Sequence, residues 1–146
     1  MLLIIVFALL LGVSCGYALI SGGRSEQAVA IIMILGSAGS MIAAHPPARL
    51  WHGTENGILL IDLLALLAFA IITLLSDRFW PIWTTGFQLL SVAAHFGPML
   101  RSANIAIPFA FEEEVWGYVI LVQLILVTRS SRRSASERAA KRWSLF

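Results

Sequence analysis

The sequence is poor in charge: only 12% of its 146 residues are charged, whereas a soluble domain carries about 25%. Hydrophobic residues make up 59% of the chain, and the mean hydropathy is +0.87. A soluble protein of this length needs polar side chains to cover its surface, but here the apolar residues stand in long runs. The composition therefore excludes an ordinary soluble domain and indicates that lipid is the solvent.

The sequence also lacks the usual signatures of catalysis. Its one cysteine, Cys15, lies in an apolar run, which excludes an intrachain disulfide and indicates a small packing residue. No phosphate-binding glycine loop, nucleophile elbow, Cys-x-x-Cys pair or serine-centred triad is recognisable. We therefore expect a non-enzymatic protein without a cofactor.

Five apolar segments predict an all-α, polytopic membrane helix bundle. They run over residues 2–20, 27–44, 57–75, 80–100 and 111–128. Each is near the roughly 20 residues that a helix needs to cross a bilayer core of about 30 Å. Strands of a barrel are a poor alternative, because these runs are continuous rather than alternating. We expect one membrane-embedded domain over residues 1–129, followed by a basic cytoplasmic tail over residues 130–146.

The basic residues predict the orientation of this bundle. Six of the ten lie in the tail or next to it: Arg129, Arg132, Arg133, Arg138, Lys141 and Arg142. With a cytoplasmic tail, five spans place Arg24 and Arg78 on the same side and leave only Arg49 and Arg101 outside. The positive-inside rule therefore favours an external N-terminus and a cytoplasmic C-terminus.

The tail itself has two interpretations. Ala139, Trp143 and Phe146 share one face of a short amphipathic helix that would lie on the inner leaflet. The alternative is a solvated basic segment. No folded basic domain accompanies it, so we do not expect nucleic acid as a partner.

Small residues repeat along the first two segments. The stripes consist of Ala8, Gly12 and Gly16 in the first segment and Gly36 and Ser40 in the second. Small residues four apart let helix backbones approach closely in lipid. We expect the two helices to pack on each other through these stripes; alternatively, one stripe faces a partner subunit.

The fourth segment carries a polar stripe, formed by Thr84, Gln88, Ser91 and His95. Their spacing places all four on one helix face, which should avoid lipid and meet protein or water. Three roles are open for the stripe: interhelical hydrogen bonds that fix the packing, a proton or ion path, and a ligand contact.

The third segment contains one ionisable residue, Asp62. The link around residues 76–78 is short, so the third and fourth helices should form an antiparallel hairpin. Asp62 and His95 are nearly equidistant from that link, so they should meet at one depth in the outer half of the membrane. Such a pair is either a structural polar contact or a protonation site.

The three histidines raise the question of a metal. His45, His52 and His95 all fall on the outer side in this topology, near Glu55 and the acidic run of residues 112–114. Histidine and carboxylate are common transition-metal ligands, but the spacing matches no metal motif. A metal site, or a haem held by His95 and His45, is therefore a minor hypothesis.

One stretch resembles a known family. Residues 76–83, Ser-Asp-Arg-Phe-Trp-Pro-Ile-Trp, followed by Gly86, Gln88 and His95, are similar to an uncharacterised family of small, multispanning bacterial inner-membrane proteins. The likeness covers mainly the third to fifth helices, about half of the chain. It implies a compact helical protein of the bacterial inner membrane and carries no activity to transfer.

These observations leave three functional hypotheses. The leading one is an accessory or scaffold subunit in the bilayer that packs against other membrane proteins or against copies of itself. The second is a small proton-linked transporter or channel component that uses Asp62, Gln88 and His95. The third is a metal- or haem-binding membrane protein that uses the outer histidines.

Overall fold

The computed structural model describes residues 2–43, 53–96 and 109–143, with side chains described over 2–42, 57–95 and 115–137. These residues form five α-helices and no strand, which confirms the all-α prediction. The helices are α1 (Leu2–Ser21), α2 (Arg24–Ala43), α3 (Gly53–Leu75), α4 (Trp80–Phe96) and α5 (Phe109–Trp143).

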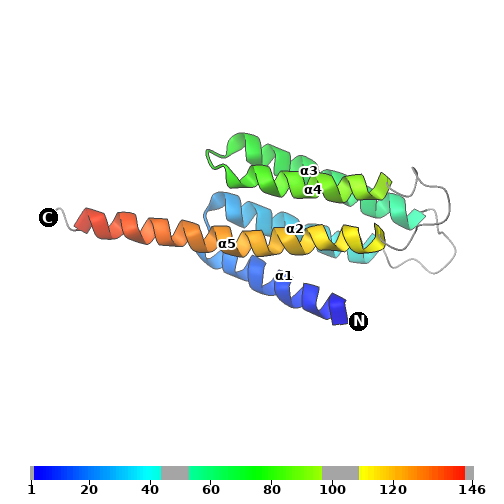
Figure 1. Cartoon of the computed structure of the whole chain (residues 1–146), viewed down its shortest axis with the longest axis horizontal. Helices are drawn as coiled ribbons and strands as arrows, with labels where there is room; N and C mark the ends of the chain where they lie inside the picture. Colours follow the sequence, from blue (N-terminus) through cyan, green and yellow to red (C-terminus); the bar gives the residue numbers. More distant parts are fainter. Residues whose placement is uncertain (1, 44–52, 97–108, 144–146) are drawn as a thin grey trace.

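The helices lie side by side along the long axis of the molecule, and successive helices run in opposite directions (Figure 1). Each helix packs on its neighbour in sequence, and α5 also packs on α1, which closes the bundle into a ring. A smaller contact joins α2 to α5 across the ring. The links α1–α2 and α3–α4 therefore lie at the end of the bundle from which α5 projects (Figure 1).

The α1–α2 link is short because glycine occupies it. The Gly22 amide donates to the Ala18 carbonyl at 2.8 Å, which terminates α1. A Cβ at Gly22 would overlap the Ala18 carbonyl oxygen and lie 2.8 Å from the Cβ of Glu26. Only glycine lets the chain reverse here within two residues.

The core is narrow, and much of the apolar surface faces outward. Its buried side chains are Cys15, Ala18, Val29, Ala30, Met33, Phe69, Ile120, Leu121 and Leu124. By contrast, Ile20 is 86% exposed and Leu74 is 85% exposed, and many other aliphatic side chains are similarly uncovered. An apolar surface of this extent requires a partner or lipid to cover it.

Three of the helices are long and apolar enough to cross a membrane within the described residues: Leu2–Ser21, Arg24–Ile42 and Gly57–Leu75. The structure thus supports three of the five predicted spans by length and composition. Helix α4 is shorter, with 17 residues described, and carries the polar stripe.

Helix α5 does not end where the sequence predicts the membrane domain to end. It continues through position 129 to Trp143 as one helix of 35 residues, about 52 Å long. The segment 129–143 contains no glycine or proline, and its five arginines and three alanines favour helix more than its four serines disfavour it. It also extends a helix that already exists, so it needs no nucleation. In the structure the tail runs straight on from the bundle rather than as a separate helix (Figure 1).

The small-residue stripes do not form the predicted α1–α2 contact. Ala8 and Gly12 are exposed, and a Cβ placed on Gly12, Gly16 or Gly36 would meet no atom within 4 Å. Helix α1 instead buries Ser14, Cys15 and Ala18, which are also small. The stripe of Ser40 and Gly36 on α2 is only half-buried.

Close approach occurs at two other glycines. A Cβ on Gly39 would lie 3.3 Å from Ile61 of α3, and one on Gly117 would lie 3.3 Å from Phe7 of α1. Spacing alone did not predict these contacts, because several small-residue registers coexist on α1 and α2.

Candidate functional site

The polar stripe of α4 faces the interior of the bundle. Thr84, Gln88 and Ser91 are 1%, 6% and 7% exposed, whereas Trp83 and Leu89 on the other side of the helix are more than half exposed. This orientation satisfies the expectation that polar groups avoid lipid. Helix α4 packs on both α3 and α5, and two residues of the stripe, Gln88 and His95, form hydrogen bonds with α3.

Two residues of the stripe, Gln88 and His95, form hydrogen bonds with Asp62 of α3. The His95 Nε2 atom lies 2.8 Å from Asp62 Oδ2. The Gln88 side-chain amide donates to Asp62 Oδ1 at 3.1 Å and approaches the Asp62 backbone carbonyl at 3.4 Å. The contact between Asp62 and His95 that equal depth predicts is therefore present.

The Asp62–His95 pair is mostly buried but retains some exposed surface. The side chain of His95 is 10% exposed and that of Asp62 is 19% exposed. Each carboxylate oxygen has a separate partner, so Gln88 holds the carboxylate in place while His95 shares the other oxygen. A carboxylate and an imidazole in this geometry can hold a proton between them and pass it on.

A second polar contact joins the same two helices nearer their link. Thr73 Oγ1 lies 2.8 Å from Thr85 Oγ1, and it also lies 2.9 Å from the Phe69 carbonyl, to which it donates. Neither threonine is ionisable. This contact therefore resembles the interhelical hydrogen bonds that stabilise membrane helices, and it offers a neutral comparison for the Asp62 site.

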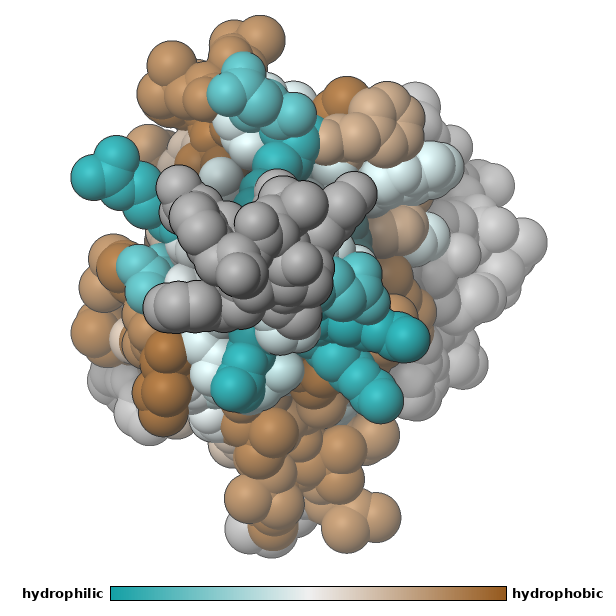
Figure 2. All heavy atoms as spheres, turned by 90° about the vertical axis from the view of Figure 1, so that its left-hand side faces the viewer, coloured by the Kyte–Doolittle hydropathy of each residue, from teal (hydrophilic) through white to brown (hydrophobic). Residues whose placement is uncertain are grey.

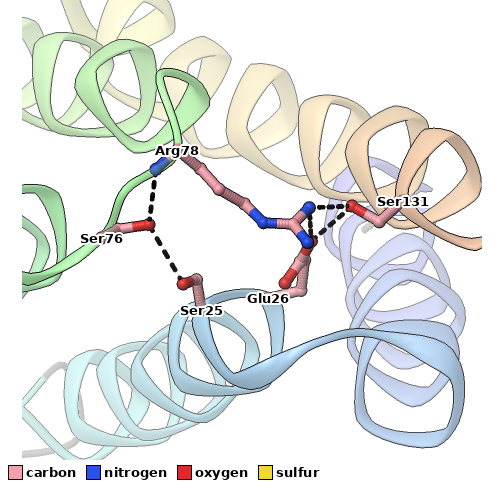
Figure 3. Close-up of polar contacts among 5 residues, drawn as sticks. All are labelled: Ser25, Glu26, Ser76, Arg78 and Ser131. Carbon is pink, nitrogen blue, oxygen red and sulfur yellow. Dashed lines mark hydrogen bonds and ion pairs between the residues drawn. The ribbon is translucent and has the colours of Figure 1, made fainter. Parts of the chain in front are cut away.

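An ionic cluster that the sequence did not predict lies at the end of the bundle where the short links are (Figure 3). Glu26 of α2 is 1% exposed. Its Oε1 atom accepts hydrogen bonds from Ser131 Oγ of α5 at 2.7 Å and from Arg78 Nη1 at 3.3 Å. Arg78 Nη1 also donates to Ser131 Oγ at 2.6 Å, and Ser25 and Ser76 bridge the two links at 3.3 Å.

The cluster connects three separate parts of the chain. Arg78 comes from the α3–α4 link, Glu26 from the first turn of α2, and Ser131 from the projecting part of α5 (Figure 3). The second oxygen of Glu26, Oε2, is buried and makes no hydrogen bond to the described residues. A buried carboxylate is stabilised by a nearby cation, and the contacts of Glu26 with Arg78 and Ser131 join α2 to the α3–α4 link and to α5.

A signal for this cluster is present in the sequence. Arg78 lies in the α3–α4 link, and Glu26 is the sole acidic residue in the first turn of α2. Two short links at the same end of an up-and-down bundle must lie close together. Opposite charges in such links are therefore natural partners.

The outer metal and haem hypotheses receive no support from the described residues. The side chains of His45, His52, Glu55 and residues 112–114 lie outside the described part of the chain. His95 is described and contacts Asp62. Within the described ranges no group of three His, Cys, Asp or Glu side chains is arranged to hold a metal.

The comparisons with known proteins yield no relative. No family model matches the sequence, and no curated protein or solved structure matches it either. The predicted likeness to small bacterial inner-membrane proteins therefore stays a prediction. The assignment of function rests on the residues of this chain alone.

Proposed function

We propose that this chain is a small multi-pass membrane protein in which Asp62 and His95 form a proton-accepting pair, as a proton-linked transporter or channel component. The observation that carries the proposal is the 2.8 Å contact between His95 Nε2 and Asp62 Oδ2, held by Gln88. Two ionisable groups that share a hydrogen bond inside apolar helices have the composition of a proton relay.

The depth of the pair supports this role. Asp62 lies about 20 Å from the C-terminal end of α3, at 1.5 Å per residue. With the proposed orientation and with the C-terminal end of α3 at the inner edge of a bilayer core of about 30 Å, the carboxylate would lie in the outer half of the hydrocarbon region. An ionisable residue at that depth costs free energy and is usually tied to a function.

The competing role for the pair is purely structural, like that of Thr73 and Thr85. A structural pair needs only a hydrogen bond, which neutral amides supply as well. A proton relay needs a group that binds and releases a proton. The two roles therefore differ in whether the protonation state of Asp62 changes in the folded protein.

Infrared difference spectroscopy on the full chain in bilayers tests this directly. We expect acidification to produce a carboxylic C=O band that disappears in Asp62→Asn and shifts in His95→Gln. Thr73→Val with Thr85→Val is the matched control, because it removes a neutral contact between the same two helices, and it should leave the band unchanged. If Asp62→Asn gave the same difference spectrum as the unmodified chain, Asp62 would not change its protonation state and the pair would be only a packing contact.

A second candidate is the accessory or scaffold subunit, and the exposed face of α1 favours it. Ala8 and Gly12 are exposed, and a Cβ on Gly12 or Gly16 would meet open space. A small-residue face of this kind lets a helix of another subunit approach closely. Gly12→Leu and Gly16→Leu should then leave the fold intact and abolish co-purification of a stoichiometric partner or a second copy in mild detergent. Retention of the partner in both variants would contradict this candidate.

For localisation, we propose the bacterial inner membrane, with all five helices as spans, the N-terminus external and the C-terminus cytoplasmic. The excess of basic residues in the links and tail at one end supports the orientation. The choice of the bacterial inner membrane rests only on the resemblance carried by residues 76–83. A reporter fused after Phe146 should be active only in the cytoplasm. Activity on the external side would reverse the orientation.

A further inference from the structure

One face of α5 changes abruptly from apolar to basic. Val122 and Leu126 are 46% and 60% exposed, and the exposed Arg129 and Arg133 follow them along the chain. Spacings of four, three and four residues keep all of these side chains on one helix face. On the outer surface of α5, the apolar region therefore ends between Leu126 and Arg129.

That change coincides with the end of the bundle. Ser131 contacts Glu26 in the first turn of α2 and Arg78 in the α3–α4 link. Arg132 Nη1 donates to Ser21 Oγ at the end of α1 at 3.3 Å. Arg129 lies only about 3–5 Å before this level along α5. Long basic side chains at such a position can extend towards the lipid headgroups.

Other arginines stand at the same end. We define the arginine collar as Arg24, Arg129, Arg132 and Arg133, all of which are exposed. Seen from this end, hydrophilic residues surround the projecting end of α5, and apolar residues lie around them (Figure 2). Since Arg129 and Arg133 directly follow the exposed Val122 and Leu126 on one face, this part of the collar lies where the apolar surface of α5 ends.

Nearby carboxylates neutralise this collar only in part. The carboxylate of Glu26 is buried and is occupied by Arg78 and Ser131. Glu137 pairs with Arg133 at 3.2 Å, but both side chains are more than 60% exposed, so this pair is weak. Among the described residues, Arg24, Arg129 and Arg132 form no ion pair with a carboxylate.

We propose that the arginine collar binds the phosphates of anionic phospholipids in the leaflet at this end of the bundle, an inference that rests on membrane insertion but not on the Asp62–His95 pair. Guanidinium groups bind phosphate oxygens through paired hydrogen bonds. Basic residues immediately beside a membrane span attract anionic lipids.

The placement favours lipid over a soluble acidic partner. Arg129 and Arg133 continue the face that carries Val122 and Leu126, so a ligand that binds there is in contact with an apolar surface as well. A phospholipid supplies both a phosphate and acyl chains. All four of these side chains are exposed, so this face of α5 is turned outward from the bundle.

The test uses the full chain in vesicles of phosphatidylcholine mixed with phosphatidylglycerol. Spin-labelled versions of each lipid report the fraction that is immobilised at the protein surface. We expect phosphatidylglycerol to be preferred, and we expect Arg129→Gln with Arg133→Gln to lower the preference by up to about fivefold per arginine. Arg129→Lys with Arg133→Lys should retain most of it, because the charge is kept.

Two controls make the result specific. Arg49→Gln with Arg101→Gln removes the same charge from the other two interhelical segments and should leave the preference unchanged. Inorganic phosphate should reduce the preference no more than sodium chloride of equal ionic strength. An unchanged preference in Arg129→Gln with Arg133→Gln, an equal loss in the control variant, or specific competition by phosphate would each overturn the proposal.

Discussion

Arg78→Ala removes the cation that contacts the buried carboxylate of Glu26. Breaking a buried ion pair from one side costs about 3–5 kcal/mol, because the remaining charge has no partner. The Arg78 side chain is 45% exposed, so solvent already screens the pair and the cost should be lower. Ser131 also continues to donate to the carboxylate. We therefore expect Arg78→Ala to lower the free energy of unfolding by about 2 kcal/mol.

Neutralising the carboxylate should partly restore that stability. Glu26→Gln keeps a side-chain oxygen that can accept from Ser131, and alone it should cost about 1 kcal/mol. With Glu26→Gln and Arg78→Ala together, no charge is left buried, so the double variant should be more stable than Arg78→Ala alone. A double variant that is more stable than the single variant Arg78→Ala indicates a buried ion pair rather than general packing.

The assay is reversible unfolding in mixed dodecylmaltoside–SDS micelles, followed by circular dichroism. Arg133→Ala with Glu137→Gln is the control, because this pair is exposed and should change the free energy of unfolding by less than about 0.5 kcal/mol. The reasoning is refuted if the double variant at Glu26 and Arg78 is less stable than Arg78→Ala, since the carboxylate would then not need Arg78.

Three further predictions use the same unfolding assay. Gly117→Leu should destabilise the bundle by about 1–3 kcal/mol through overlap with Phe7, whereas Gly12→Leu should change stability little; equal losses would mean that Gly12 is packed after all. Gly22→Ala should be more damaging than Gly23→Ala, because a Cβ at Gly22 meets backbone whereas one at Gly23 meets the end of the Glu26 side chain; the reverse order would contradict the described turn. The losses in free energy of unfolding from Asp62→Leu and His95→Leu should be non-additive, with a coupling energy of at least about 0.5 kcal/mol. Additive losses would indicate that the two side chains are not in contact.

Sequence reasoning located one polar site correctly and missed the other. Asp62 and His95 could be paired because both lie on a hairpin with a short link, and equal distance from a link fixes equal depth. The partners Glu26 and Ser131 are 105 positions apart. Their contact depends on how α5 closes the ring against α1 and α2, which no local spacing encodes.

The predicted α1–α2 contact through the small-residue stripes is not found in the structure, for a related reason. Periodicity shows that Ala8, Gly12 and Gly16 share a face, but it does not show which face meets a neighbour. Ser14, Cys15 and Ala18 offer a second small face, and in the structure that face packs. The helical continuation past position 129 could have been expected from its composition, since nothing in it breaks a helix.

Proton flux in liposomes tests the central claim most directly. The full chain is reconstituted into vesicles that contain a pH-sensitive dye, and the external buffer is then acidified. The account predicts protein-dependent acidification that is lost in Asp62→Asn with His95→Gln and retained in Thr73→Val with Thr85→Val, both variants remaining folded by circular dichroism. Equal flux in the Asp62–His95 variant and the unmodified chain, or no protein-dependent flux at all, would contradict it.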